Sequence, residues 1–277
     1  MPESTDASVY FIGNATTIIR CNGFTLLTDP NFLHRGQQAR LGWGIRTRRR
    51  TEPAMSVADL PPVDLVVLSH LHGDHWDEIA ERGLDPYVPI VTTPHAADVL
   101  RGRGFGNAIG LETWQTYQVH RNSGVLSITA VPARHAPGPL DRLLPPVMGS
   151  VLDFCRGDDL DLRLHISGDT ILDPCLAEIP RRFPEIDAAI VHLGGTRIFR
   201  VLVSMDGVQG AEWLQLIKPE VALPVHYDDY EAFTSPLSEF QHHVRRLGLT
   251  HAVHYLMRGE TCRLPLRTRP RPVARPR

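Results

Sequence analysis

Three short runs rich in β-branched and aromatic residues open the chain. They are SVYFIG, TTIIRC and FTLLTD, and each has the length and composition of a β-strand. Asn22 and Gly23 separate the second run from the third, and this pair favours a type I′ turn. We therefore predict three strands, of which the last two form a β-hairpin.

The periodic pattern then disappears between Pro30 and Pro62, in a stretch that contains glycine, arginine and proline. A segment of this length is too long to be a passive connection in a compact domain. Long loops on a rigid scaffold often carry function, so we predict that this one faces the substrate. It also holds a dense basic cluster, Arg46 and residues 48–50.

Strand and helix patterns alternate along the rest of the chain. DLVVLS is a continuous apolar run of the buried-strand type, and a short helical stretch follows around 78–82. Further strands are predicted at 89–93, 115–120, 124–133, 151–155, 162–167, 186–194 and 221–226, with a final pair from 252 to 264, and helices at 96–102, 207–217 and 236–247. This order predicts an α/β fold of two packed sheets with helices on their outer faces.

Length and charge narrow the class of protein. The 277 residues contain no Gly/Ser-rich linker, which predicts one domain over 1–265 and a disordered basic tail over 266–277. A formal net charge of −2 gives no overall field that would recruit nucleic acid or an anionic membrane. The basic residues are nearly all arginine, which is typical of a GC-rich bacterial genome.

The chain shows no signal-peptide pattern at its start and no apolar run of about 18 residues. We therefore expect a cytoplasmic protein without stable membrane insertion. Its four cysteines are scattered without CxxC spacing, which argues against a thiolate zinc site and against a disulfide framework.

The most specific chemical signal is the string SHLHGDHWD at the end of the DLVVLS strand. Alternation along an extended segment points His70 and His72 the same way, and the following turn can bring Asp74 and His75 to a second position nearby. Nitrogen and hard oxygen ligands suit zinc first, then manganese or iron. The string therefore predicts a pair of divalent metal ions, in preference to histidines that merely cap a helix.

SHLHGDHWD resembles the signature of the metallo-β-lactamase superfamily. The hairpin YFIGNATTIIRCNGFTLLTDP is similar to that of the branch that includes ascorbate-6-phosphate lactonase and the N-acyl phosphatidylethanolamine phospholipase D. The resemblance runs from about Tyr10 to Phe233. It implies the αββα sandwich of that superfamily, with two mixed sheets and helices on the outer faces.

Three later motifs extend the resemblance. VPARHAPGP, HISGDT and LPVHYDDYEAF imply His135, Asp169 and His226 as further metal ligands. Taken singly, each has another interpretation: His135 as a loop histidine, Asp169 as a turn residue, and His226 as a partner of Asp228. The resemblance divides the seven ligands between two metal positions. The first consists of His70, His72 and His135, and the second of Asp74, His75 and His226. Asp169 bridges the two.

Two adjacent ions would hold a bridging hydroxide that attacks a small-molecule ester, lactone or phosphodiester. Asp74 would be both a ligand and the group that accepts the proton of the attacking water. Asp77 would either accept an N–H from a ligand imidazole, which we favour, or cap the following helix. His192 lies at the end of an apolar strand before two glycines, and we predict that it contacts the substrate and stabilises an oxyanion, with a core histidine as the alternative.

Other functions remain open at this point. A mononuclear iron oxidoreductase of the persulfide-dioxygenase type would also carry the SHLHGDHWD motif. A non-catalytic metal-binding module is a third class of function. The flavodiiron oxidoreductases of the superfamily carry glutamate at the position of His72, which favours hydrolysis here. The chain lacks the long insertion of RNA-cleaving relatives and a basic groove, so we expect a small-molecule substrate and no nucleic acid. The sequence indicates no oligomeric state.

Overall fold

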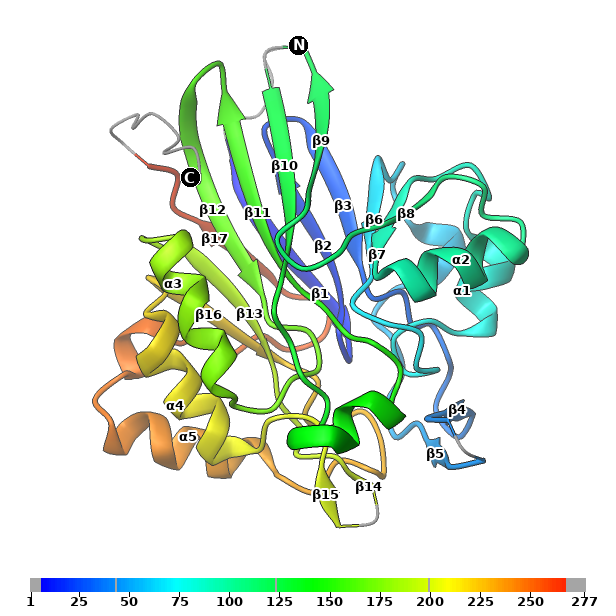
Figure 1. The fold of residues 1–277 in the computed structure, drawn as a ribbon, viewed down its shortest axis with the longest axis vertical. Coiled ribbons are helices and arrows are strands. Elements are labelled where there is room, and N and C mark those ends of the chain that lie inside the picture. The colour runs from blue at the N-terminus through cyan, green and yellow to red at the C-terminus, as the bar shows by residue number, and fades with distance from the viewer. Residues whose placement is uncertain (1–5, 43, 123, 199, 268–277) are drawn as a thin grey trace.

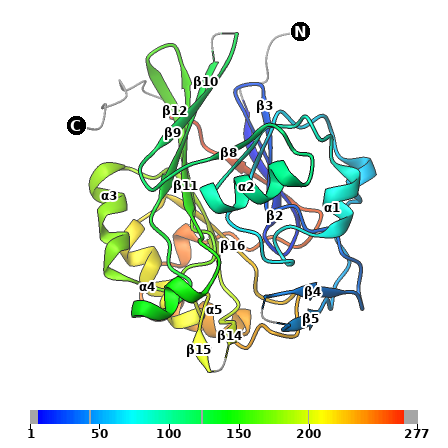
Figure 2. The same cartoon turned by 45° about the vertical axis from the view of Figure 1, so that its right-hand side comes forward.

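The protein is described by a computed structural model over residues 6–42, 44–122, 124–198 and 200–267. Two β-sheets lie face to face, and helices cover the outer face of each sheet (Figures 1 and 2). This is the α/β sandwich that the sequence predicted, and the prediction is confirmed. The predicted disordered tail falls almost entirely on residues outside the described ranges.

The first sheet is mixed. Its seven strands lie in the order β17 (Thr261–Leu264), β1 (Ala7–Gly13), β2 (Thr16–Cys21), β3 (Phe24–Thr28), β6 (Leu65–Val67), β7 (Ile90–Thr92) and β8 (Ala108–Gly110). The pairs from β17 to β3 are antiparallel, and those from β3 to β8 are parallel. Asn22 and Gly23 both have positive φ, 51° and 78°, as a type I′ turn requires, so the predicted hairpin is confirmed.

The second sheet has six strands, in the order β16 (Val221–Val225), β13 (Ala188–His192), β12 (Asp159–Ile166), β11 (Gly149–Arg156), β10 (Gly124–Val131) and β9 (Thr116–Arg121). β12, β13 and β16 run parallel to one another. The predicted final strand pair is wrong, because only β17 forms there. Val253 makes a single isolated bridge to Ala222, and a 3₁₀ turn over Thr250–Ala252 precedes it.

Apolar side chains fill three layers. The layer between the sheets includes Phe24 and Phe154, whose ring centroids lie 6.4 Å apart. The two outer layers are covered by α1 (Glu78–Gly83) and α2 (Pro94–Gly102) on the first sheet, and by α3 (Glu178–Arg182), α4 (Gly207–Ile217) and α5 (Leu237–Arg246) on the second. Within the described ranges no helix has both the length and the apolar character needed to cross a membrane.

The segment from 30 to 62 has more structure than its sequence pattern predicted. It contains a small hairpin, β4 (Gln38–Arg40) and β5 (Arg46–Arg48), and a 3₁₀ turn, η1 (Val57–Asp59). Other short elements are 3₁₀ turns η2 (Gly138–Leu143) and η3 (Pro174–Ala177), and a second small hairpin, β14 (Arg197–Ile198) and β15 (Val201–Leu202). Both small hairpins lie at the same end of the sandwich (Figure 1).

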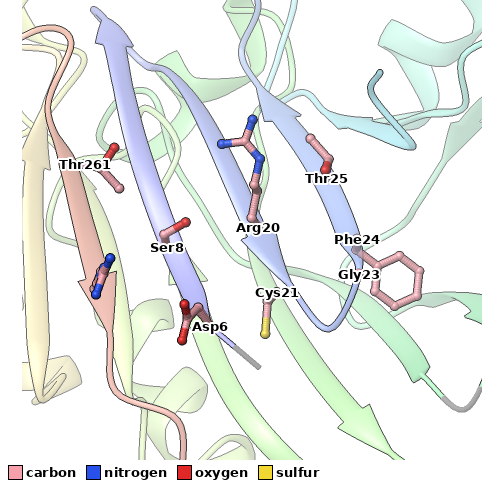
Figure 3. Close-up of a pocket in the computed structure, with 9 residues that line it drawn as sticks. Asp6, Ser8, Arg20, Cys21, Gly23, Phe24, Thr25 and Thr261 are labelled. Carbon is pink, nitrogen blue, oxygen red and sulfur yellow. The ribbon is translucent and has the colours of Figure 1, made fainter. Parts of the chain in front are cut away.

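The two ends of the sandwich differ in character. The parallel strands β3, β6, β12, β13 and β16 all lead into loops at the end that carries the small hairpins. At the other end, beside the Asn22–Gly23 turn, lies an open hollow of about 340 Å³. Figure 3 shows Ser8, Arg20 and Thr25 on neighbouring strands there. The hollow contains none of the predicted site residues, so the chemistry belongs to the opposite end.

We expect Phe154→Ala to lower the free energy of unfolding by about 3–5 kcal/mol, because Phe154 is fully buried between the sheets and its loss leaves a cavity. Denaturant unfolding measures this. Tyr87→Ala is the control, because Tyr87 is 78% exposed and its loss leaves no cavity. Equal effects of the two variants would contradict the assigned inter-sheet core.

Candidate metal centre

All seven predicted ligands lie in loops that follow strands at one end of the sandwich. The loop from β6 to α1 carries the SHLHGDHWD string, and the other three ligands follow β10, β12 and β16. Each side chain is almost completely withdrawn from solvent; these residues are His70, His72, Asp74, His75, His135, Asp169 and His226. The structure therefore brings together side chains that are up to 156 positions apart in the sequence.

The first metal position is a cluster of three imidazoles. His70 Nε2 lies 2.8 Å from His72 Nδ1, and the rings of both lie within 4.9 Å of the ring of His135, measured between centroids. The Nε2 atom of His135 is buried and has no hydrogen-bond partner among the described residues. Three ring nitrogens therefore converge within 4.8 Å of one another.

The second metal position combines two imidazoles with carboxylates. His226 Nε2 lies 3.2 Å from His75 Nε2 and 3.3 Å from Asp74 Oδ2. Asp169 Oδ2 lies 3.4 Å from His75 Nε2, and Asp169 also forms a compact group with His70 and His75. Asp169 therefore lies between the two positions, where a bridging carboxylate belongs.

The donor set fits two divalent ions. Imidazole nitrogens and carboxylate oxygens are the ligands that zinc, manganese and iron accept, and neither group includes a thiolate. Asp74 Oδ1 and Asp169 Oδ1 are buried without a hydrogen-bond partner among the described residues. Buried polar atoms without partners are costly, and bound cations would satisfy them.

Asp29 is a buried carboxylate that the sequence reasoning missed. It follows β3, and its Oδ2 atom lies 3.3 Å from His75 Nδ1. Its Oδ1 atom accepts hydrogen bonds from the backbone N–H of Ser69, at 2.7 Å, and from the Ser69 hydroxyl, at 2.9 Å. By accepting from Nδ1, Asp29 directs Nε2 of His75 toward the second metal position. In the sequence Asp29 belongs to the TDP turn that contributed to the family resemblance, but nothing in that turn indicates a contact with His75.

Backbone carbonyl groups orient two other ligands. His135 Nδ1 lies 3.0 Å from the carbonyl oxygen of Val203, and His226 Nδ1 lies 3.1 Å from that of Leu193. An imidazole that donates its Nδ1–H to a carbonyl presents an unprotonated Nε2 to a cation. His226 itself has a φ of 61°, a left-handed conformation that is held by the surrounding loop.

The structure does not support the favoured role of Asp77. No hydrogen bond joins it to a ligand imidazole among the described residues. Its Oδ1 atom accepts from the backbone N–H groups of Ile79 and Ala80 at the start of α1. Its Oδ2 atom accepts from the backbone of Phe32 and Leu33. Asp77 is therefore a helix N-cap that also fixes the chain after β3, because both of its carboxylate oxygens accept from backbone N–H groups of these two segments.

The structure places His192 at the end of β13, where its side chain is fully buried. Its Nε2 atom lies 3.3 Å from Asp29 Oδ2, and its Nδ1 atom lies 3.2 Å from the Ser167 hydroxyl. In this position it supports Asp29, which in turn orients His75. The contact of His192 with substrate stays a prediction.

The electrostatic balance differs between the two positions. Burial, together with charge repulsion from His135, lowers the pKa of His72 to about 3. Burial also lowers the pKa of His75, but Asp169, Asp74 and Asp29 outweigh it and hold that pKa well above the ordinary value. The carboxylates thus concentrate negative charge at the second position, which favours a cation there.

The basic cluster of the 30–62 segment divides between two environments. Arg49 is fully buried and donates to the carbonyl oxygen of Asn31 at 3.0 Å. Arg46 and Arg40 line a hollow of about 430 Å³ beside the SHLHGDHWD loop. Asp77 and Glu78 line the same hollow. Because acidic and basic side chains face this hollow together, it offers no uniformly basic surface to a polyanion.

Comparison with known proteins agrees with this geometry. Residues 25–227 match the family profile described as the beta-lactamase superfamily domain. The chain belongs to the metallo-β-lactamase superfamily. Within this superfamily it is 30% identical over 200 residues to a UPF0173 metal-dependent hydrolase of Deinococcus radiodurans, covering 72% of this chain and 79% of that protein. The superfamily resemblance inferred from the motifs is therefore confirmed.

Two further proteins are similar to this chain. The yeast N-acyl-phosphatidylethanolamine-hydrolyzing phospholipase D from Saccharomyces cerevisiae is 29% identical over 140 residues, which are 49% of this chain and 29% of that protein. The crystal structure of an isothiocyanate hydrolase from Delia radicum gut bacteria superimposes with a TM-score of 0.77 at 22% identity, covering 92% of this chain and 98% of that one. The second likeness shows the shared fold alone.

We expect protein purified without chelator to carry about two divalent ions per chain, because the ligands form two groups joined by Asp169. Elemental analysis of the purified chain measures this. His135→Ala should lower the content to about one ion. His165→Ala is the control, since His165 is a buried histidine stacked on Trp213, outside both metal positions. A wild-type chain that binds a single ion at saturation would contradict the two-ion arrangement.

Proposed function

We propose that this metal-dependent hydrolase uses two divalent ions, zinc in the first instance, to cleave an ester, lactone or phosphodiester bond of a small molecule. The observation that supports this most directly is the convergence of seven buried ligands into two groups that share Asp169 as a neighbour. When bound, such ions supply Lewis-acid activation of water and of the carbonyl or phosphoryl group. A mononuclear iron centre would leave one of the two ligand groups, such as Asp74, His75 and His226, without a metal ion.

Asp74 is the residue best placed to handle the proton. Its Oδ2 atom faces His226 Nε2 at 3.3 Å, whereas Oδ1 is buried without a hydrogen-bond partner among the described residues. The pKa of the carboxyl group is lowered, because the charge of His75, together with the hydrogen bond and charge of His226, outweighs the effect of burial. An ionised carboxylate with one oxygen free can orient an attacking water and accept its proton.

An apolar pocket beside the first metal position supports a substrate that carries an apolar group. The pocket has a volume of about 120 Å³ and lies between η2 and the β14–β15 hairpin. Leu140, Leu143 and Val203 are among the apolar residues that line it, and Val203 also holds His135 through its carbonyl oxygen. Leu140 and Leu143 are 41% and 57% exposed and lie beside the other apolar residues of the pocket, and exposed apolar groups that cluster in this way often mark a ligand-binding surface. A substrate bound at the ions could therefore extend into this pocket.

We expect Asp74→Asn to lower kcat by about 10²–10⁴-fold on any substrate that the wild type hydrolyses, because an amide cannot accept the proton. Turnover is measured together with metal content, so that a lost ion is separated from a lost base. Asp228→Asn is the control: Asp228 lies two residues after His226 but pairs with Arg258. Wild-type turnover by Asp74→Asn would contradict the proposed role.

We expect Leu143→Asp to raise KM about tenfold for esters with an apolar side group and to leave methyl-sized substrates unaffected, since burying a leucine-sized surface contributes roughly 1.5 kcal/mol. Steady-state kinetics on a matched ester series gives the comparison. Met257→Asp alters another exposed apolar residue, which lies outside the pocket, and should change KM for neither substrate class. The pocket assignment fails if KM for the apolar series does not rise.

A further inference from the structure

Asn14 occupies the turn between β1 and β2 and lies directly behind the second metal position. The residue is fully buried, and its φ of 53° places it in the left-handed region. Asparagine tolerates this conformation better than most residues. An amide side chain at this point is therefore compatible with the turn. Buried polar atoms usually find partners, and Nδ2 does so, whereas Oδ1 has no hydrogen-bond partner among the described residues.

The backbone and side chain of Asn14 hold the two loops that form the second metal position. Its side-chain Nδ2 donates to the backbone carbonyl of Asp74 at 2.6 Å. Its own carbonyl oxygen accepts from the backbone N–H of His226 at 3.0 Å. Its backbone N–H donates to Asp229 Oδ2 at 2.8 Å, three residues beyond His226. One residue thus joins the loop after β6 to the loop after β16.

We propose that Asn14 is a positioning residue that sets the affinity of the second metal position without touching an ion. Asp74 and His226 lie in loops that follow strands of different sheets, so the distance between their ligand atoms depends on how the two loops are held together. Asn14 bonds to the backbone of both. Among the described residues, none of these hydrogen bonds involves a histidine of the first position, where the Ser69 hydroxyl lies 2.9 Å from His70 Nδ1 and the Val203 carbonyl oxygen lies 3.0 Å from His135 Nδ1.

Buried charges hold Asn14 in place. Asp229, which accepts its backbone N–H, also accepts from Arg258 Nε at 3.1 Å and from the Thr51 hydroxyl. Arg49 Nη2 lies 3.5 Å from Asp229 Oδ1, and both side chains are fully buried. A buried carboxylate with several donors around it is a rigid anchor. The contact from Asn14 to Asp229 therefore does not depend on a flexible surface group.

Arg49 also stabilises the SHLHGDHWD loop, through a second set of hydrogen bonds that runs by way of Asn31. Its Nη1 donates to Asn31 Oδ1, and Asn31 Nδ2 in turn donates to the backbone carbonyl of Gly73 at 3.1 Å. The Tyr230 hydroxyl also donates to Asn31 Oδ1 at 2.8 Å. This route ends one residue before Asp74, whereas Asn14 bonds to Asp74 itself. Removing the Asn14 amide should therefore displace Asp74 while the rest of the loop stays folded.

The effect should be large enough to measure. Groups that orient metal ligands without binding the metal typically change affinity by about 10–100-fold when they are removed. The inference rests on the two-ion function proposed above, because it distinguishes the second ion from the first. A wild-type chain that binds only one ion would overturn both proposals, whereas unchanged second-ion affinity in the variants would overturn this one alone.

Asn14→Gly provides the sharpest test. Glycine adopts a φ of 53° without strain and keeps both backbone hydrogen bonds, so that only the contact from Nδ2 to Asp74 is lost. Asn14→Asp also tolerates the turn and places a carboxylate oxygen opposite the Asp74 carbonyl. The control is Asn22→Gly: Asn22 is a buried, left-handed asparagine at the other end of β2, and its amide donates to Asp161, far from the ions.

Zinc is titrated into ion-free protein in competition with chromophoric chelators, which resolves a stronger and a weaker binding step. We expect Asn14→Gly to weaken one step by about 10–100-fold and to leave the other unchanged. Asn14→Asp should weaken the same step further, and Asn22→Gly should match the wild type. Far-UV circular dichroism and thermal unfolding of the ion-free chains report the fold independently of activity.

Three results would overturn the inference. The first is wild-type affinity for both ions in Asn14→Gly, and the second is an equal loss of both ions, which would indicate a general effect on the fold. The third is an equal loss of affinity in Asn22→Gly. If Asn14→Gly does not fold, Asn14→Asp serves as the test. A folded Asn14→Asp chain that binds both ions with wild-type affinity would also overturn the inference.

Discussion

The rest of the structure depends on the burial of three carboxylates, Asp29, Asp74 and Asp169, at one end of the sandwich. A carboxylate withdrawn from water is stable only if positive charge or hydrogen-bond donors surround it. Imidazoles from loops of both sheets supply part of this compensation, and bound metal ions would complete it. The parallel strands lead their loops to the same end, so the topology of the sheets makes this concentration of charge possible.

The sequence predicted those parts of the fold and of the site that short segments specify on their own. The Asn22–Gly23 turn needs positive φ at two adjacent positions, and few other residue pairs supply it. SHLHGDHWD places four ligands within six residues, so their proximity follows from the chain itself. The more distant residues His135, Asp169 and His226 could be identified only by resemblance to a family, and the structure brings all three to the same centre.

The partners of several residues could not be identified from the sequence, for a common physical reason. Asp77 was assigned a role from its nearness to the ligand string, and His192 from its place at a strand end before two glycines, but a side chain bonds to whatever the tertiary structure places beside it. Asp77 bonds to the backbone after β3, and His192 lies beside Asp29, which is 163 positions away in the sequence. The bonds of Asn14 to Asp74 and Asp229 span 60 and 215 positions. No local pattern encodes such partners. Arg49 belongs to a basic cluster in the sequence, and only the fold shows that it is fully buried.

Apart from the shared Asp169, each metal position draws two ligands from loops of the first sheet and one from a loop of the second: His70 and His72 with His135, and Asp74 and His75 with His226. The ions would therefore act as a non-covalent cross-link between the sheets. During synthesis all strands of the first sheet except β17 emerge before the second sheet. Their loops carry an incomplete set of ligands until the later strands dock against them. Capture of the second ion must wait for β16 and the residues beyond it, so the supply of metal in the cell would act on a late step of folding.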